Sequence, residues 1–387
     1  MTTIKLPTAI GHLADYRMSA PRAFATSAGP FDRIAFAAAH VVADPLADVD
    51  PWLQPAIDWE RTLAFREHLW DLGLGVAEAM DTAQRGMGLD WPTSLELIRR
   101  SLAAAKARDG ALIACGAGTD HLALSPALGV ADVIAAYEEQ IEAIEGLGGR
   151  IILMSSRALA ACARSPDDYG AVYDRILGQV REPVIIHWLG EMFDPALAGY
   201  WGCDDHLAAM DVCVDVIAAH ALKVDGIKLS LLDKDKEILL RDRLPEGVRM
   251  YTGDDFNYAE LIAGDGRRHS DALLGIFDPI APAASAALLA LSQGRLGEFH
   301  DIFGPTVALS RHIFAAPTRF YKTGVVFMAF LNGHQDHFVM VGGQQSARSI
   351  LHLAELFRLA DRAGLLGDPE QAAARMRKVL AVNGVET

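Results

Sequence analysis

The sequence predicts an α/β protein in which eight βα units close into a (β/α)8 barrel, the TIM barrel, followed by a C-terminal α-helical extension. Short apolar runs of the β type alternate with longer helical patterns, which is typical of a parallel sheet covered by helices. Eight such runs are present, and eight strands close this barrel. A doubly wound open sheet is the less favoured alternative, because no Gly-x-Gly-x-x-Gly motif follows the first strand.

The predicted strands are short and mostly apolar, and they lie at Arg33–His40, Gly75–Met80, Ala111–Cys115, Arg150–Met154, Pro183–Trp188, Asp225–Leu229, Arg249–Thr252 and Asp271–Phe277. The predicted barrel helices have apolar residues three and four apart, and they lie at Trp59–Leu72, Ser94–Arg108, Val130–Leu147, Asp167–Val180, His206–Ala221, Lys236–Arg243 and Tyr258–Ala263. Further helical stretches follow at Ser285–Leu291, Gly297–Phe314, Gly324–Leu331 and Ser346–Ala363. We therefore divide the chain into an irregular N-terminal segment (1–30), the barrel (31–282) and the helical extension (283–387).

The composition indicates a soluble protein with a large core. Hydrophobic residues make up 51% of the 387, and a formal net charge of −15 argues against a nucleic-acid-binding surface. No signal-peptide pattern is evident, and the apolar run Ile280–Leu291 is too short to span a bilayer. The four cysteines form no Cys-x-x-Cys pair and are surrounded by apolar residues, which indicates reduced thiols in a reducing compartment. We expect a cytoplasmic protein with a small-molecule substrate and with no nucleic-acid or membrane partner.

Lys228 is the most informative residue, because it lies near the end of the predicted strand Asp225–Leu229. Strand alternation puts Gly226, Lys228 and Ser230 on one face, which in a barrel opens into the mouth. A desolvated amine in that position has a lowered pKa and attacks a carbonyl to form a Schiff base. The alternative is an ordinary strand-end lysine that extends to water. Lys322, in the predicted helical extension, is a competing buried lysine that we rank below Lys228.

His187 is the second informative position, at the end of the run Pro183–Trp188. Ile185 and His187 share a strand face, so His187 and Lys228 open into one cavity if their strands are neighbours. Histidine is the side chain best suited to move protons near neutral pH. The alternative is a core histidine that hydrogen-bonds a backbone carbonyl.

Further polar side chains gather where the predicted strands end. In Asp81–Gly86, the Thr82 hydroxyl and nearby backbone amides suit a carboxylate, although a generic polar turn has the same composition. Ser155 and Arg157 follow the fourth strand, where Arg157 has the alternative of pairing with a surface acid. Asp254 and Asp255 follow the seventh strand, and a helix cap is their alternative.

Metal ligation receives only weak support from the sequence. The sets His187, Glu191 and Asp194, and Asp204, Asp205 and His206, contain suitable nitrogen and oxygen donors. Neither set has the spacing His-x-His or His-Glu-x-x-His, so we predict no metal site.

The chain resembles the dihydrodipicolinate synthase and N-acetylneuraminate lyase superfamily of Schiff-base aldolases, collinearly from strand one through strand eight. Gly226-Ile227-Lys228 resembles the family's strand-six Gly-Ile-Lys, whose lysine forms the imine. The run Pro183–His187 resembles its Pro-Ile-Ile-Leu-Tyr, and Thr252–Asp255 resembles its Ser-Gly-Asp-Asp. Asp81–Ala83 stands where the family has the carboxylate-binding Gly-Thr-Thr. The chain is identified as a member of a divergent dihydrodipicolinate-synthase-like branch.

Three departures accompany these matches. The family's strand-five tyrosine is His187 here, only Thr82 carries over from Gly-Thr-Thr-Gly-Glu, and no tyrosine follows the fourth strand. The lysine chemistry is therefore better supported than the family's pyruvate-plus-aldehyde reaction, and a role in lysine biosynthesis is not expected.

The resemblance implies an aldolase-type lyase that acts on a 2-keto acid or keto-sugar-acid derivative through a lysine imine, without a cofactor or metal. We expect Lys228, His187 and Thr82 to be catalytic, and Asp81, Ala83, Ser155, Asp254 and Asp255 to bind substrate. The resemblance also implies a homodimer or homotetramer. The alternatives are a dehydratase of a deoxy-keto sugar acid that uses the same imine, a metal-dependent barrel lyase or isomerase, and a non-catalytic sugar-acid-binding barrel.

Overall fold

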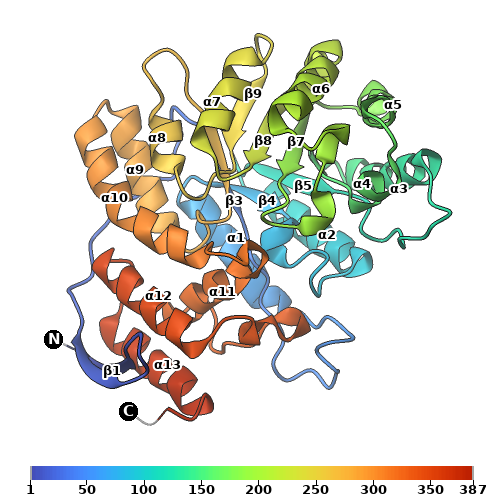
Figure 1. The fold of residues 1–387 in the computed structure, drawn as a ribbon. Helices are drawn as coiled ribbons and strands as arrows, with labels where there is room; N and C mark the ends of the chain where they lie inside the picture. The colour runs from blue at the N-terminus through green and yellow to red at the C-terminus, as the bar shows by residue number, and fades with distance from the viewer. Residues whose placement is uncertain (1, 386–387) are drawn as a thin grey trace.

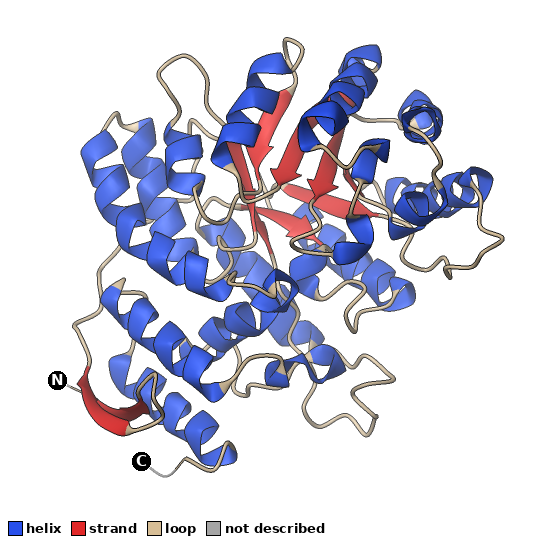
Figure 2. Cartoon of the chain, viewed as in Figure 1, coloured by secondary structure: helices blue, strands red, loops and turns tan. Residues whose placement is uncertain are grey.

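The computed structural model describes residues 2–385 and confirms the predicted barrel. Eight parallel strands close in the order β10-β3-β4-β5-β6-β7-β8-β9, with helices around them (Figures 1 and 2). Their bounds are β3 Ala35–Ala38, β4 Gly75–Glu78, β5 Ile113–Ala117, β6 Ile151–Met154, β7 Val184–Leu189, β8 Val224–Ser230, β9 Arg249–Thr252 and β10 Asp271–Leu274. Each lies at a predicted strand, and several are shorter than predicted because pairing stops before the apolar run does.

The barrel helices begin where side chains cap them. Asp58, Asp90, Asp205 and Asp233 each accept a backbone N–H in the first turn of the helix that follows. The bounds are α1 Trp59–Asp71, α2 Trp91–Lys106, α3 Val130–Gly146, α4 Arg157–Cys162, α5 Pro166–Gln179, α6 His206–Ala219, α7 Lys234–Arg243, α8 Tyr258–Ala263 and α9 Ala281–Ser292. The short 3-10 turns are η1 Asp81–Ala83, η2 Pro195–Leu197, η3 Tyr200–Gly202 and η4 Ala221–Lys223. Helix α2 begins at Trp91, before the predicted start at Ser94, because Asp90 caps it. Helix α4 was not predicted.

Strand alternation sorts side chains between two cores, as the sequence predicts. Phe36, Ile152, Ile185 and Tyr251 belong to a small cluster inside the barrel. Residues of the opposite strand faces, such as Ile227, pack in the larger cluster between strands and helices. The barrel interior is therefore filled below its mouth, so function is confined to the strand ends.

The C-terminal extension covers the barrel end toward which the strands point. Its elements are α10 Leu296–Ile313, η5 Thr318–Phe320, α11 Tyr321–Leu331, η6 Val341–Ser346, α12 Ile350–Arg362 and α13 Pro369–Val382. Helix α11 is buried along its whole length and packs against η1, the turn that follows β4. Figure 1 shows α11 below the barrel, on the side of the strand arrowheads. Helix α13 was not predicted.

The N-terminal segment differs from the prediction. We expected residues 1–30 to be irregular, but β1 (Thr3–Pro7) and β2 (Leu13–Arg17) form an antiparallel hairpin. The Tyr16 hydroxyl donates to Asp361 in α12 at 2.8 Å, so partners more than 340 residues away hold the hairpin in place. These long-range partners are what the local sequence does not reveal.

The expected boundary between residues 282 and 283 falls inside α9, the helix of the eighth βα unit, so that unit extends to Ser292. None of the described helices combines the length and the apolar character needed to cross a bilayer.

Candidate active site

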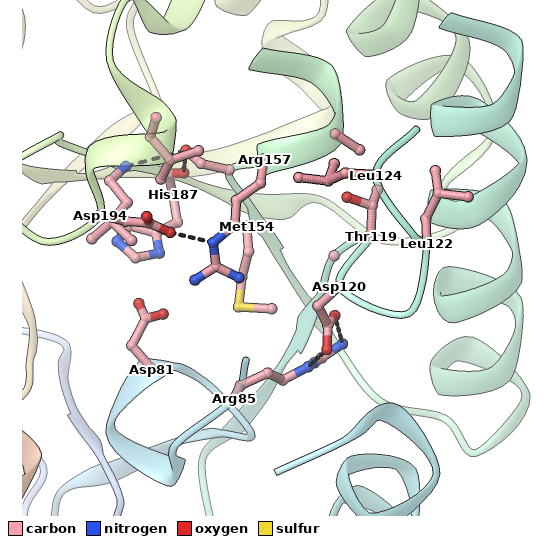
Figure 3. A pocket seen from close by; sticks show the side chains of 15 residues that line it. Asp81, Arg85, Thr119, Asp120, Leu122, Leu124, Met154, Arg157, His187 and Asp194 are labelled. Carbon is pink, nitrogen blue, oxygen red and sulfur yellow. Dashed lines mark hydrogen bonds and ion pairs between the residues drawn. The ribbon is translucent and has the colours of Figure 1, made fainter. Parts of the chain in front are cut away.

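Two cavities meet at the C-terminal ends of the strands. The inner cavity, about 130 Å³, is lined by side chains that include His187 and Ser155. The outer cavity, about 370 Å³, lies toward the extension and is lined by side chains that include Tyr321 and Lys322. Both cavities share the residues Asp81, Arg85, Arg157, Leu189 and Asp194. Figure 3 shows several of these side chains converging from different loops, as at the catalytic face of a barrel.

Lys228 lies at the mouth of the barrel and is only 7% exposed. It pairs with His187 across β7 and β8 and with Tyr251 across β8 and β9. Burial lowers the pKa of its ammonium, and the carboxylates of Asp255 and Asp81 partly offset this effect. Among the described residues, no hydrogen bond or ion pair engages its Nζ atom. The amine is therefore free to act as a nucleophile.

Gly226 lies two residues before Lys228 on the same strand face. A Cβ atom at Gly226 would come within 2.6 Å of the Arg249 carbonyl oxygen and 2.7 Å of the Tyr251 ring. The glycine therefore makes room for the tyrosine that packs inside the barrel, next to the lysine.

His187 is the immediate neighbour of Lys228 and is 1% exposed. Its Nε2 atom lies 3.2 Å from the Ser230 hydroxyl, and its buried Nδ1 atom has no partner among the described residues. Burial and the charge of Lys228 hold the pKa of His187 well below its usual range. The imidazole is therefore neutral at physiological pH and can accept a proton.

Thr82 and Tyr321 form a buried hydroxyl pair at the mouth. Their oxygen atoms are 2.8 Å apart, although the residues are separated by 239 positions in sequence. Tyr321 comes from the first turn of α11, and burial raises the pKa of its phenol well above its usual value. The pair therefore stays protonated and is able to relay a hydrogen bond. Sequence reasoning missed Tyr321, because nothing in its local pattern places α11 against η1, the turn after β4.

The loop that carries Thr82 is strained at both ends. Ala79 and Gln84 have positive φ angles of 52° and 67°, a region that residues other than glycine rarely adopt. Such outliers persist where surrounding structure enforces them, and they cluster at functional sites. The Ala83 amide donates to the Met80 carbonyl and its side chain is fully buried. That amide is not available to a ligand, so we leave Ala83 out of the site.

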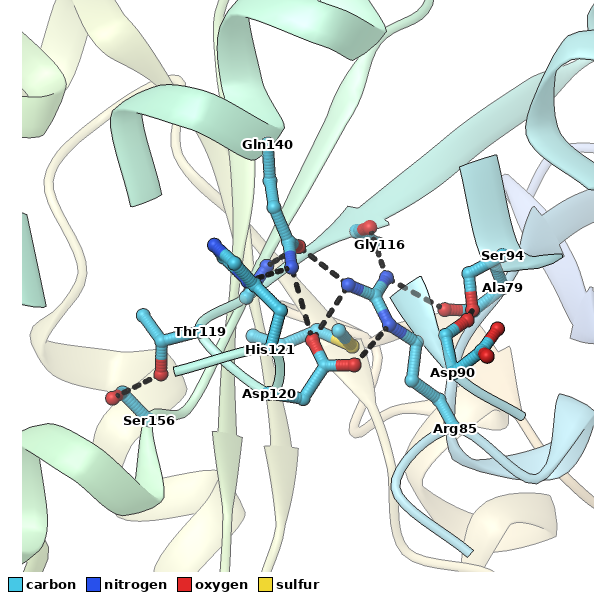
Figure 4. A network of polar contacts seen from close by, with 12 residues as sticks. Ala79, Arg85, Asp90, Ser94, Gly116, Thr119, Asp120, His121, Gln140 and Ser156 are labelled. Carbon is cyan, nitrogen blue, oxygen red and sulfur yellow. Dashed lines mark hydrogen bonds and ion pairs between the residues drawn. The ribbon is translucent and has the colours of Figure 1, made fainter. Parts of the chain in front are cut away.

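Arg85 holds this loop to the next one along the chain. Its guanidinium forms a bidentate pair with Asp120, donates to the Gly116 carbonyl at 2.6 Å and also contacts Gln140 (Figure 4). These partners satisfy the buried cation, so its role is to fix the two loops relative to each other. Gln140 extends the network by accepting from the Gly118 amide at 2.7 Å.

The two acids after β9 have different surroundings. Asp254 accepts hydrogen bonds from the side chain and backbone of Asn257, which is the alternative, turn-capping role. Asp255 accepts from the Ile276 amide at 2.9 Å, and burial raises its pKa to about 7, although the nearby Lys228 opposes this rise. Asp255 therefore modulates the charge of Lys228, and we assign Asp254 to the turn.

The remaining predicted residues lie at the rim. Ser155 donates to the His187 carbonyl at 2.8 Å and accepts from the Leu189 amide at 3.2 Å, so it positions β7 as well as lining the inner cavity. Arg157 pairs with Asp194. The Asp81 carboxylate has no hydrogen-bond or ion-pair partner within the part of the chain that the structure describes.

The candidate metal ligands do not converge. Glu191 contacts His206 at 3.2 Å, and Asp194 is instead paired with Arg157. Within residues 2–385, no group of three or more His, Cys, Asp and Glu side chains is placed to hold a metal ion.

Comparison with solved structures identifies the fold. A dihydrodipicolinate synthase from Acinetobacter baumannii, complexed with pyruvate, is 16% identical, with a TM-score of 0.62 over 86% of this chain and 99% of that one. The 4-hydroxy-tetrahydrodipicolinate synthase of Methylacidiphilum fumariolicum SolV is 15% identical, with a TM-score of 0.64 over 89% and 98%. YagE, a prophage protein from Escherichia coli K12 in complex with pyruvate, is 12% identical, with a TM-score of 0.63 over 92% and 99%.

These similarities confirm the resemblance seen in the sequence, and they define the protein as a barrel with the dihydrodipicolinate synthase fold. A comparison with curated proteins finds no match. The family model described as "Protein of unknown function (DUF993)" matches residues 4–385, so the chain belongs to the DUF993 family.

Proposed function

We propose that the protein is a Schiff-base-forming, aldolase-type lyase that acts on a 2-keto acid or keto-sugar-acid derivative. The observation that carries this proposal is the amine of Lys228, which is buried, has a lowered pKa and makes no hydrogen bond at the mouth of the barrel. The Gly226-Ile227-Lys228 run and the pyruvate complexes of two proteins with the same fold support it.

In the proposed reaction, neutral Lys228 attacks the C2 carbonyl of the substrate, and loss of water gives an iminium ion. The C3–C4 bond then breaks as a proton leaves the C4 hydroxyl. The electron pair of that bond moves into the iminium to form an enamine, and C4 leaves as an aldehyde. Protonation of the enamine at C3 and hydrolysis of the resulting iminium return the lysine and release the second product, a shorter 2-keto acid.

Two groups are suited to the proton transfers. Neutral His187, which lines the inner cavity, accepts the hydroxyl proton as a general base. The Thr82–Tyr321 pair shuttles a proton between the carbinolamine oxygen and the cavity. We propose no cofactor beyond the lysine, and a homodimer or homotetramer in the cytoplasm.

Reductive trapping tests the proposal. The protein is incubated with sodium borohydride and a panel of 2-keto acids, and the adduct is located by peptide mass mapping. We expect a substrate-dependent adduct on Lys228 in the wild type and none there in Lys228→Arg. Absence of an adduct with every keto acid, or an adduct on Lys322 alone, would overturn the proposal. Analysis of the released products distinguishes C–C cleavage from dehydration through the same imine.

A further inference from the structure

The outer cavity contains more positive than negative charge. Six charged side chains line it: Asp81, Arg85, Arg157, Asp194, Arg319 and Lys322. The pairs Arg85–Asp120 and Arg157–Asp194 account for two of the four cations. Lys322 and Arg319 remain, against the single unpaired carboxylate of Asp81. The cavity therefore has an uncompensated positive charge.

Lys322 is the cation that most needs a partner. It is 4% exposed, its Nζ atom donates to the Arg319 carbonyl at 3.1 Å and to the Met87 sulfur at 3.3 Å, and the same atom lies 4.7 Å from the centre of the Tyr321 ring. No described carboxylate lies within ion-pairing distance of that amine, and a buried ammonium without one is costly. Burial lowers its pKa to about 8, with Asp81 opposing and Arg157 assisting that shift.

The backbone adds to this positive potential. Lys322 lies in the first turn of α11, an eleven-residue helix whose N-terminal amides carry the positive end of the helix dipole. A lysine at this end of a helix is itself unfavourable, because both charges are positive. An anion bound in the outer cavity would offset two costs: the desolvation of the buried Lys322 ammonium and its repulsion by the positive end of the helix dipole.

Arg157 connects the outer cavity to the inner one, which is lined by His187, the strand neighbour of Lys228. The Arg157 side chain lines both cavities, and its Nε atom is used by Asp194. A Cβ atom at Gly86 would lie 2.7 Å from an Arg157 terminal nitrogen, so the glycine leaves room for the guanidinium. Figure 3 shows this guanidinium between Asp194 and the space above Arg85, pointing into the cavity.

We propose that the outer cavity binds a second anionic group, a carboxylate or a phosphate, at the far end of the 2-keto acid substrate, with Lys322 as its main ligand and Arg157 and Arg319 assisting. This inference rests on the proposed function and deepens it, because it makes the substrate at least dianionic. It also gives Lys322 a role other than imine formation. In this arrangement the substrate extends from Lys228 past Asp81 and Arg157, two of the five residues that line both cavities.

The test compares three probes of the same chain length that differ only in the group distal to the keto carbon: 2-oxopentanoate (methyl), 2-oxoglutarate (carboxylate) and 2-oxo-4-phosphonobutanoate (phosphonate). The readout is the concentration of each probe that half-saturates borohydride trapping. In the wild type we expect the two acidic-tailed probes to half-saturate at concentrations at least about tenfold lower than 2-oxopentanoate, because charge-assisted hydrogen bonds form at the far end. The ratio of the half-saturating concentrations of the two acidic probes shows whether the site prefers a carboxylate or a phosphate-like group.

The decisive variant is Lys322→Met, which removes the charge and shortens the unbranched side chain by one atom. We expect this variant to lose the preference for acidic tails, while 2-oxopentanoate is trapped at the same concentration as in the wild type. Lys322→Arg, which keeps a positive charge, should retain part of the preference. Lys106→Met, at an exposed lysine that donates to the Leu147 carbonyl, is the matched control and should behave as the wild type. Lys322→Met breaks no ion pair, so we expect the variant to fold, and its thermal melting is measured beside that of the wild type.

The outcomes separate the two proposals. Trapping on Lys228 without a preference for acidic tails, or a preference that survives in Lys322→Met, overturns the anion subsite and leaves the imine chemistry standing. If nothing traps, calorimetric titration with inorganic phosphate tests the subsite alone: binding that is weakened in Lys322→Met supports it, and no binding overturns it. An adduct on Lys322 itself overturns the subsite.

Discussion

Replacing Tyr321 by phenylalanine removes one oxygen from the pair it forms with Thr82 and leaves the ring packing unchanged. The two hydroxyl oxygens are 2.8 Å apart, and Thr82 is 1% exposed. The variant therefore leaves a buried hydroxyl unpaired, which costs about 1–3 kcal/mol of folding free energy. A fold of this size tolerates that cost, so the protein should fold and melt a few degrees lower.

The kinetic effect of Tyr321→Phe should be much larger than its effect on stability. Proton relays of this kind contribute about 10²- to 10⁴-fold to turnover. Lys228 does not contact the hydroxyl pair through any hydrogen bond in the described residues, so binding of the keto acid should change little. We expect the half-saturation of borohydride trapping to stay within about threefold of the wild type, while kcat falls by at least about 100-fold.

A double-mutant comparison gives the sharpest check of this reasoning. If the two hydroxyls act as one unit, Thr82→Val with Tyr321→Phe should lose no more activity than either single variant. Turnover of Tyr321→Phe within threefold of the wild type would refute the relay, and so would additive losses in the double variant. The measurement requires steady-state kinetics on the substrate found by trapping, with thermal melting as the folding control.

Three further predictions concern charge and packing. Burial raises the pKa of Glu237 from its ordinary 4.5 to about 8, so its ionisation destabilises the fold as pH rises through this range. The advantage of Glu237→Gln in unfolding free energy should therefore grow by on the order of 5 kcal/mol between pH 4.5 and 8, and parallel denaturation profiles would contradict this. The Asp255 carboxylate raises the pKa of Lys228, so Asp255→Asn should let the amine lose its proton at lower pH. The rate of borohydride trapping should then rise with pH at lower pH values than in the wild type, and a shift to higher pH would argue against this coupling. Gly226→Ala should cost about 1–3 kcal/mol by overpacking, whereas Gly170→Ala, where a Cβ meets nothing within 4 Å, should be neutral or stabilising in the same melts.

The sequence determined the barrel because the relevant signals are local. The apolar runs, their number and the helical periods between them are read within windows of a few residues, and closure of eight parallel strands follows from them. Alternation along β7 and β8 was sufficient to place Ile185 inside the barrel and Ile227 outside it. It also put His187 and Lys228 on inward faces, which the register between the two strands then paired. Each of these results depends on a period of two, which side-chain geometry imposes on any strand.

Only the tertiary structure decided which groups complete the site. Tyr321 and Lys322 come from α11, and nothing in their local sequence places that helix over the turn that carries Thr82. The hairpin at the N-terminus likewise depends on α12, and the unpaired state of Lys228 depends on every neighbour that surrounds it. Long-range packing sets these contacts and the burial that shifts the pKa values, and burial belongs to the folded chain as a whole. The sequence by itself therefore determined the strand position of Lys228, and the fold decided what surrounds it.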